Sequence, residues 1–358
     1  MRIEARLTDP LEAQLLPRGP GRLRVGLVVP QSGALGMVGP SAVNTSLLAA
    51  HELNVSGGVH GAYVDLVLVD GGRSPLEVAT EVDRLCAADA VDALVGFHTS
   101  DVHRAIEATV AGRTPYVFTP PHEGGPRASG VVCIGTDPVH QLRLAIAWLT
   151  AHHSLSRWAL IGNDYIWPKS VHRAATRLVN HAGGRVVLDR LVPLGQVHAH
   201  LDRLVEALRR SSPDAVLLSL VGRDLAAFNS ALRQADLDRH LVRLSGALEE
   251  NGLLACDGDR TGMLYAAMSS FVSLADERYQ GLAARYASLF GPQAPLLDTY
   301  AAGVYDGLHL VAALAGDSVL RADRMVPATA RELARAHRDE VHLALADGFD
   351  FSVVTGVA

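Results

Sequence analysis

The residues with the greatest capacity for chemistry stand in short loops that follow strand-like segments. After the apolar segment 93–96 come His98, Ser100 and Asp101, the side-chain types that a nucleophilic enzyme would use. The sequence has no GxSxG elbow, no HExxH and no paired carboxylates that can be assigned to one site. We therefore expect no catalytic residue, and we keep an enzyme that uses His98, Ser100 or Asp101 as an alternative.

Potential metal and phosphate ligands are scattered along the chain. His122 and Glu123 are adjacent, and histidines pair at 152–153 and at 198–200, but these pairs lack the compact spacing typical of zinc sites. The glycine-rich loop at 30–36 matches neither GxGxxG nor the GxxxxGK[ST] phosphate loop. We expect neither a metal nor a cofactor.

Residues 162–168 read GNDYIWP and place two aromatic side chains at the end of a strand-like segment. Only 5% of the chain is aromatic, so Tyr165 and Trp167 two positions apart are unusual. Pro168 is expected at the first position of the following helix. Taken alone, these rings suit a packing staple as well as a binding surface.

Length and composition describe a globular protein with more than one core. The 358 residues suit two domains, and the chain is 49% hydrophobic and 20% charged, with a net charge of −6. There is no basic stripe with interleaved aromatics, so we expect no direct nucleic-acid binding. No apolar run approaches the length of a membrane span, and residues 1–22 lack the apolar region of a signal peptide. We therefore expect a cytoplasmic protein.

Strand-like and helix-like segments alternate along the chain, first from Leu23 to about 136 and again from 137 onward. This alternation is typical of α/β folds with parallel, doubly wound sheets, and we expect two such lobes joined by a hinge that the chain crosses several times. The expected division is an N-terminal extension at 1–22, lobe 1 at 23–136 plus about 268–322, and lobe 2 at 137–267 plus about 323–358. Ligands of such sheets bind outside the carboxyl ends of strands, so the sequence predicts a cleft between the lobes.

Four blocks of the sequence resemble the amide- and urea-binding branch of type I periplasmic binding proteins, which includes cytoplasmic amide sensors. GNDYIWP is the most specific of them. LRVGLVVPQSGALG, VGFHTSDVHRAI and TPPHEG agree with that branch in order and position. The resemblance covers roughly Leu23 to Leu314.

The resemblance implies which residues hold a ligand. Ser100 would hydrogen-bond an amide, while Tyr165 and Trp167 would form a wall on the second lobe. His98, His122 and other positions depart from the aromatics usual in that branch, which leaves the ligand's identity open. The ligand-binding residues implied are Ser100, His98, Phe118, Thr119, Pro120, His122, Tyr165, Trp167 and Met268.

The resemblance also implies a function without catalysis. A sensor of this branch binds a small amide, and the closing of its cleft releases an RNA-binding antitermination protein. The family often dimerises, so a homodimer is a further implied assembly. The alternative is the substrate-binding protein of an ABC importer for urea, short amides or branched-chain amino acids.

Overall fold

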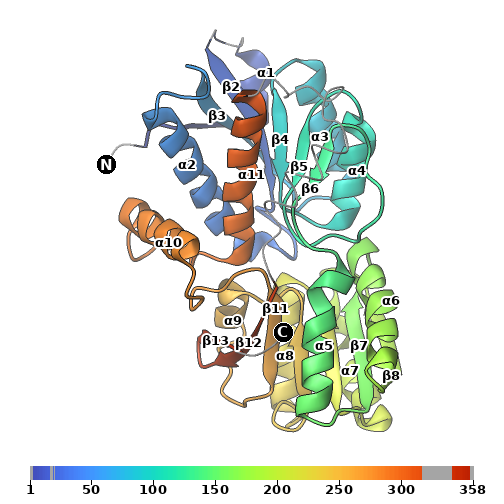
Figure 1. Ribbon diagram of the computed structural model, residues 1–358. Helices are drawn as coiled ribbons and strands as arrows, with labels where there is room; N and C mark the ends of the chain where they lie inside the picture. Colours follow the sequence, from blue (N-terminus) through green and yellow to red (C-terminus); the bar gives the residue numbers. More distant parts are fainter. Residues whose placement is uncertain (1–2, 17–18, 20, 317–340, 355–358) are drawn as a thin grey trace. The chain divides into compact units, whose positions relative to one another are not determined.

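The computed structural model describes residues 3–16, 19, 21–316 and 341–354. The described residues divide into two compact units, drawn in Figure 1. Unit 1 takes those within Met1–Pro120, Gly125–Gly135 and Gly281–Arg338, and unit 2 those within Pro121–Gly124, Thr136–Gln280 and Asp339–Ala358. The expected boundary at 322/323 lies outside the described residues.

Unit 1 is built on a six-stranded sheet with helices on both faces (Figure 1). Its elements are β1 (Arg6–Thr8), α1 (Pro10–Leu15), β2 (Arg22–Val29), η1 (Gly36–Val38), α2 (Gly39–Val55), β3 (Tyr63–Asp70), α3 (Pro75–Ala87), β4 (Ala93–Gly96), α4 (Ser100–Val110), β5 (Tyr116–Phe118), β6 (Val131–Cys133) and α11 (Thr299–Gly316). The strand order is β1-β3-β2-β4-β5-β6, and all neighbouring described strands are parallel. Helix α10 (Glu277–Phe290) contains the point where the chain passes from unit 2 to unit 1.

Unit 2 is built on a seven-stranded sheet. Its elements are α5 (Pro138–His152), β7 (Arg157–Asn163), α6 (Ile166–His181), β8 (Arg185–Val192), η2 (Val197–His200), α7 (Leu201–Ser211), β9 (Ala215–Ser219), α8 (Gly222–Gln234), β10 (Val242–Ser245), α9 (Glu250–Ala255), β11 (Leu264–Met268), β12 (His342–Asp347) and β13 (Asp350–Val353). The order is β13-β12-β11-β10-β9-β7-β8, with parallel pairing from β11 to β8. The α/β class with two mostly parallel sheets is therefore confirmed.

The central strands of both sheets are apolar because helices cover both of their faces. In β2 every residue after Arg22 is buried, and all of β9 is buried. A strand covered on both faces reads as a continuous apolar run rather than as an alternation. This is why the segment from Leu23 to Val29 predicts a central strand correctly.

Two parts of the fold carry weak sequence signals. The residues before Leu23, expected as an extension, include β1, which pairs in parallel with β3. Helix α1 is capped by Asp9 and accepts two hydrogen bonds, at Ala13 and Leu16, from the Arg24 guanidinium. Strands β12 and β13 form an antiparallel hairpin, and β12 pairs antiparallel with β11.

The start of α6 differs from the expectation. The helix begins at Ile166, so Pro168 occupies its third position and not its first. Proline is tolerated there because the N–H groups of the first turn have no intrahelical partner. As a result Trp167 lies inside the first turn, and Tyr165 is the residue that flanks it.

No helix among the described residues combines the length and apolar character needed to cross a lipid bilayer.

Candidate functional site

The unit 1 candidates lie at the carboxyl ends of two neighbouring strands. His98 and Ser100 follow β4, while Thr119 and Pro120 follow β5. These ends meet directly, because the Thr119 backbone N–H donates to the Gly96 carbonyl at 2.9 Å and its hydroxyl donates to the same oxygen at 3.2 Å. The structure therefore brings the two predicted loops together.

Both ring nitrogens of His98 are already hydrogen-bonded. Its Nδ1 lies 3.1 Å from the Thr99 carbonyl oxygen, and because a carbonyl only accepts, Nδ1 carries the proton. Its Nε2 then accepts from the Tyr116 hydroxyl at 3.0 Å. Burial lowers the pKa of His98 to about 4, so the ring is neutral near pH 7. His98 therefore cannot act as a base toward Ser100 in this arrangement.

The hydrogen bonds of Thr99, His98 and Tyr116 form a row, which continues from Tyr116 to β6 at the edge of the sheet. The Tyr116 hydroxyl lies 3.1 Å from Nδ1 of His103, and Nε2 of His103 lies 3.8 Å from the Cys133 sulfur. The Arg127 guanidinium donates to that sulfur at 2.9 Å. The row fixes the tautomers of both histidines and so the orientation of the His98 ring.

Phe118 supports this row from within the core. Its side chain is fully buried and belongs to the apolar core of unit 1. Its ring stacks on His103 with centroids 4.1 Å apart and contacts His98 at 5.2 Å. Phe118 therefore acts as a core residue that holds the two histidine rings in place.

The first turn of α4 has hydrogen-bonding capacity that its own side chains do not use. Thr99 is the N-cap residue, yet no side chain caps the helix. By contrast, Ser74 caps α3 and Asp137 caps α5. Ser100 is 2% exposed, and its hydroxyl forms no hydrogen bond with any of the described residues. An uncapped helix N-terminus with a serine at its first position favours an anion or a carbonyl oxygen.

The aromatic candidates of unit 2 form one packed pair at the end of β7. Tyr165 and Trp167 have ring centroids 6.5 Å apart with planes inclined by 29°, and both residues are buried. The Trp167 Nε1 is buried and has no hydrogen-bond partner among the described residues. It is an unused hydrogen-bond donor in the first turn of α6, a helix whose N-cap residue, Tyr165, makes no side-chain capping hydrogen bond.

His122 lies in a short loop that packs against α6. The Ser170 hydroxyl donates to the Glu123 carbonyl at 2.9 Å, which ties this loop to the helix. The His122 Nδ1 accepts from the Gly124 backbone N–H at 3.0 Å. The structure therefore places the His122 loop and the Trp167 helix side by side within unit 2.

Met268 lies apart from the other unit 2 candidates. It ends β11, and the strands β10 and β9 separate β11 from β7. Its sulfur lies 3.8 Å from the side-chain amide nitrogen of Gln141, which also donates to the carbonyls of Gly246 and Ala267. Gln141 is a residue that sequence reasoning missed, because its partners are more than a hundred positions away.

Asn163 and Asp224 are a second pair that sequence reasoning missed, and they link the end of β7 to the segment after β9. Asn163 is fully buried, and its amide donates to the Asp224 carboxylate at 2.7 Å. Its oxygen accepts from the Val221 backbone N–H at 3.0 Å. The other Asp224 oxygen, Oδ1, is buried without a partner among the described residues. The contact between Asp224 and Asn163 could not be predicted from the sequence, because no local motif joins the two residues.

Three side chains near β9 have the order of a nucleophilic triad. The Asp189 carboxylate lies 2.7 Å from Nδ1 of His172, whose Nε2 lies 2.9 Å from the Ser219 hydroxyl. The His172 hydrogen bond lowers the pKa of Asp189. Ser219 is fully buried, and a β-carbon at Gly162 would lie 2.1 Å from its oxygen. The serine therefore has no room for a substrate, and the row is a packed structural network.

Known proteins share this architecture. A substrate-binding protein of a branched-chain amino acid transporter from Streptococcus pneumoniae, solved with isoleucine, has a TM-score of 0.75 at 16% identity, over 93% of this chain and 99% of its own. An ABC transporter solute-binding protein from R. palustris, solved with benzoate, gives 0.74 at 17%, over 93% and 96%. A fatty acid ABC transporter substrate-binding protein from Thermomonospora curvata gives 0.74 at 18%, over 97% and 95%. At these identities the likeness concerns the fold, and none of the three is described as binding an amide.

A family model described as periplasmic binding protein matches residues 22–345. The match spans both described units and both groups of candidate residues. The chain therefore belongs to the periplasmic binding protein family.

Proposed function

We propose that the chain is the substrate-binding protein of an ABC importer, and that it binds a small organic molecule through a carboxylate or carboxamide group. The family supports a binding role without catalysis. The transport role is supported by the solved relatives named above. They are described as a substrate-binding protein of a branched-chain amino acid transporter, an ABC transporter solute-binding protein in complex with benzoate, and a fatty acid ABC transporter substrate-binding protein. This reading replaces the amide sensor as the leading hypothesis.

The uncapped start of α4 is the observation that carries the proposal. The Ser100 hydroxyl forms no hydrogen bond with the described residues, and the first backbone N–H groups of the helix have no side-chain cap. Thr119 lies at the adjacent strand end. Such a group of donors matches the two oxygens of a carboxylate or the single oxygen of a carboxamide.

The aromatic pair of unit 2 is a second candidate contact surface. Tyr165 and Trp167 present an apolar, planar surface with one unused N–H donor. We propose that these rings contact the apolar part of a ligand. His98 is neutral near pH 7, so it adds no positive charge that would select an acid over an amide.

Matched acids and amides test the chemical class. Calorimetric titration would compare isobutyrate with isobutyramide, leucine with leucinamide, and benzoate with benzamide, with urea added as the smallest amide. Because an uncapped helix N-terminus attracts negative charge, we expect at least one acid to bind more tightly than its amide. If no acid or amide in the panel binds, the proposed class is wrong.

Replacing Ser100 by alanine should weaken the best ligand of this panel by about tenfold or more. A hydrogen bond to a charged group contributes about 1.5–3 kcal/mol, and 1.4 kcal/mol corresponds to a tenfold change in affinity. The same titration measures the effect, and an unchanged affinity would remove Ser100 from the site.

Ser74→Ala is the matched control. Ser74 is the N-cap of α3, and its hydroxyl accepts from the Glu77 backbone N–H. Loss of an N-cap side chain costs about 1 kcal/mol of stability. We therefore expect Ser74→Ala to lower the melting temperature and to keep the ligand affinity. Ser100→Ala should keep the melting temperature and lower the ligand affinity.

The amide sensor is a second candidate, supported by the GNDYIWP block and its packed ring pair. In that role the protein would act in the cytoplasm, and amide binding would release an RNA-binding antitermination partner through a shift between two conformations. A homodimer would be its expected assembly. Tighter binding of every amide than of its matched acid, together with a cytoplasmic location on cell fractionation, would favour this candidate over the importer.

A further inference from the structure

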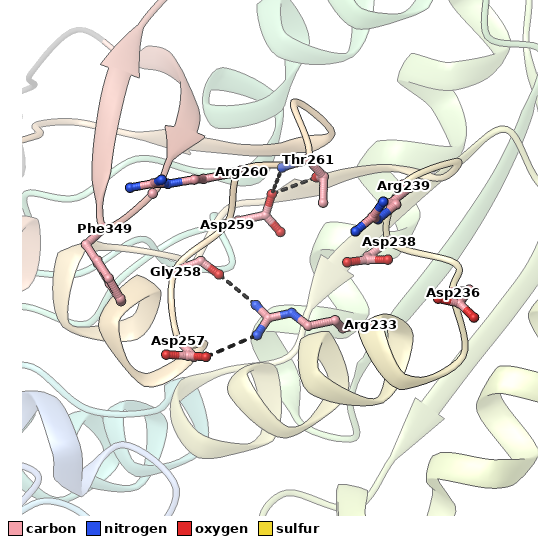
Figure 2. Close-up of a pocket in the computed structure, with 11 residues that line it drawn as sticks. Arg233, Asp236, Asp238, Arg239, Asp257, Gly258, Asp259, Arg260, Thr261 and Phe349 are labelled. Atoms are coloured by element: carbon pink, nitrogen blue, oxygen red, sulfur yellow. Dashed lines mark hydrogen bonds and ion pairs between the residues drawn. The ribbon is translucent and has the colours of Figure 1, made fainter.

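Unit 2 contains a charged cavity of about 580 Å³ at the amino ends of β10 and β11 (Figure 2). Tyr165, Trp167 and Met268 lie at the carboxyl ends of the parallel strands, on the opposite side of the sheet's length. The cavity is bounded by the turn after α8, the segment before β11 and the turn between β12 and β13. It is therefore separate from the candidate site described above.

Close backbone packing holds two walls of the cavity together. Asp259 and Gly348 exchange two backbone hydrogen bonds, at 2.8 and 2.7 Å. Gly258 has a φ of +67°, and a β-carbon there would lie 2.6 Å from the Gly348 carbonyl oxygen. Only glycine fits this approach without displacement of the backbone. The turn between β12 and β13 is thus fixed against the segment before β11.

Several charges around the cavity are already neutralised. Arg243 and Asp259 form a buried ion pair at 2.9 Å, and Thr261 bonds both. The Arg233 guanidinium donates to the carbonyls of Cys256 and Gly258. These contacts satisfy most of the polar atoms of these groups, although the Arg243 Nε is buried without a partner among the described residues.

The Asp238 carboxylate lacks such contacts among the described residues. Asp238 lines the cavity and is only 4% exposed. Its backbone carbonyl accepts from Arg243 at 3.0 Å, but no hydrogen bond or ion pair joins its carboxylate to any residue within the described ranges. A carboxylate without a protein partner keeps its acceptor sites for water or for a ligand. The Asp238 carboxylate therefore has the capacity to bind a cationic donor that enters the cavity.

Figure 2 shows Arg260 and Phe349 on the side of the cavity opposite to Asp238. Across the described chain, no hydrogen bond or ion pair engages the Arg260 guanidinium, and Phe349 is 50% exposed. Arg239 lies on the same side as Asp238 in this view, yet it forms no ion pair with that carboxylate. The cavity thus presents a negative group at one side and a positive group beside an apolar ring at the other.

We propose that this cavity binds a short peptide with free termini. Its ammonium group binds Asp238, its carboxylate binds Arg260, and an apolar side chain contacts Phe349. A single amino acid would leave most of the volume empty, since cavities of this size hold molecules of drug size. The presence of both signs in the lining, with Asp238 and Arg260 on different sides, favours a ligand that carries both charges.

The peptide Gly-Leu-Gly and its two blocked forms test the proposal. Titrations would use the full chain carrying Ser100→Ala, so that binding at the first site is weakened and contributes less to the signal. N-acetyl-Gly-Leu-Gly lacks the ammonium group and Gly-Leu-Gly-amide lacks the carboxylate. We expect each blocked peptide to bind at least about tenfold more weakly than the free peptide, because each loses one charged hydrogen bond.

Two variants assign the termini. Asp238→Asn should weaken Gly-Leu-Gly by about tenfold and abolish its preference over the N-acetyl peptide, while Arg260→Gln should abolish the preference over the amide. Arg210→Gln on α7 changes an exposed arginine outside the cavity and should leave binding unchanged.

Three results would overturn the proposal. These are no binding of Gly-Leu-Gly at millimolar concentration, equal binding of the blocked peptides, or an unchanged affinity in both cavity variants. If Asp238→Asn does not fold, as judged by circular dichroism, Arg260→Gln still decides, because this exposed side chain makes no described contact on which folding depends. Failure of the peptide proposal would not affect the proposed function, because the acid and amide panel is titrated into wild-type protein and concerns the first site.

Discussion

Replacing Asp259 by alanine is expected to lower the free energy of unfolding by about 3–5 kcal/mol, the usual cost of removing one partner from a buried ion pair. The Arg243 and Asp259 side chains are 1% and 2% exposed, and their charged atoms are 2.9 Å apart. Without the carboxylate, the guanidinium stays buried in the middle of β10 with no compensating charge. Urea unfolding monitored by circular dichroism measures the change.

Two further variants separate the charge effect from the loss of packing. Asp83→Ala removes one partner of an exposed pair, in which the side chains of Arg113 and Asp83 are about half exposed, and should change stability by no more than about 1 kcal/mol. The double variant Arg243→Met/Asp259→Leu should recover most of the loss, because well-packed apolar residues can replace a buried pair. An Asp259→Ala cost as small as that of Asp83→Ala would contradict the argument.

Acidification is expected to destabilise the protein through His98. Burial lowers the pKa of this residue from its ordinary value of 6.5 to about 4. Above pH 6.5 the ring is neutral in both the folded and the unfolded state, and stability is at its full value. As the pH falls from 6.5 to 4, only the unfolded chain takes up the proton, which lowers the free energy of unfolding by up to about 3 kcal/mol.

The difference between wild type and His98→Gln isolates this contribution from all other titrating groups. The stability advantage of wild type at pH 7 should shrink as the pH falls through this window, as measured by urea unfolding at half-unit intervals. His240→Gln, at an exposed position, serves as the control and should show a difference that does not vary in this way. A wild-type advantage that is constant from pH 7 to 4 would show that His98 does not carry the effect.

The parallel core of the fold could be predicted because it follows from local patterns. Long apolar strands such as Leu23–Val29, alternating with helical periodicity, indicate parallel strands covered on both faces. Strands β1, β12 and β13 were not predicted, because they are three, six and four residues long and carry no run of that kind. The pairing of β1 depends on β3 and that of β12 on β11, which lie far away in the sequence, and β13 pairs with β12.

The sequence predicts which unit 1 loops lie side by side, but it does not predict the hydrogen bonds of the candidate residues. The rule that ligands bind at the carboxyl ends of strands points correctly to the loops of Ser100 and Thr119 as neighbours. The state of His98 depends on Tyr116, eighteen positions later, and on burial, and neither follows from a motif. The roles of Asn163 and Asp224 likewise depend on a contact across 61 positions.

The antiparallel strand that completes the sheet of unit 2 has a consequence for synthesis on the ribosome. Strand β11 is translated more than seventy residues before β12, so a nascent chain carries it with one unpaired edge until the last segment emerges. Unpaired strand edges are templates for association with other chains. The cavity wall at Gly348 also forms only at that point, because its two hydrogen bonds to Asp259 close with the same segment. Protection by chaperones is therefore needed most between the translation of β11 and that of β12.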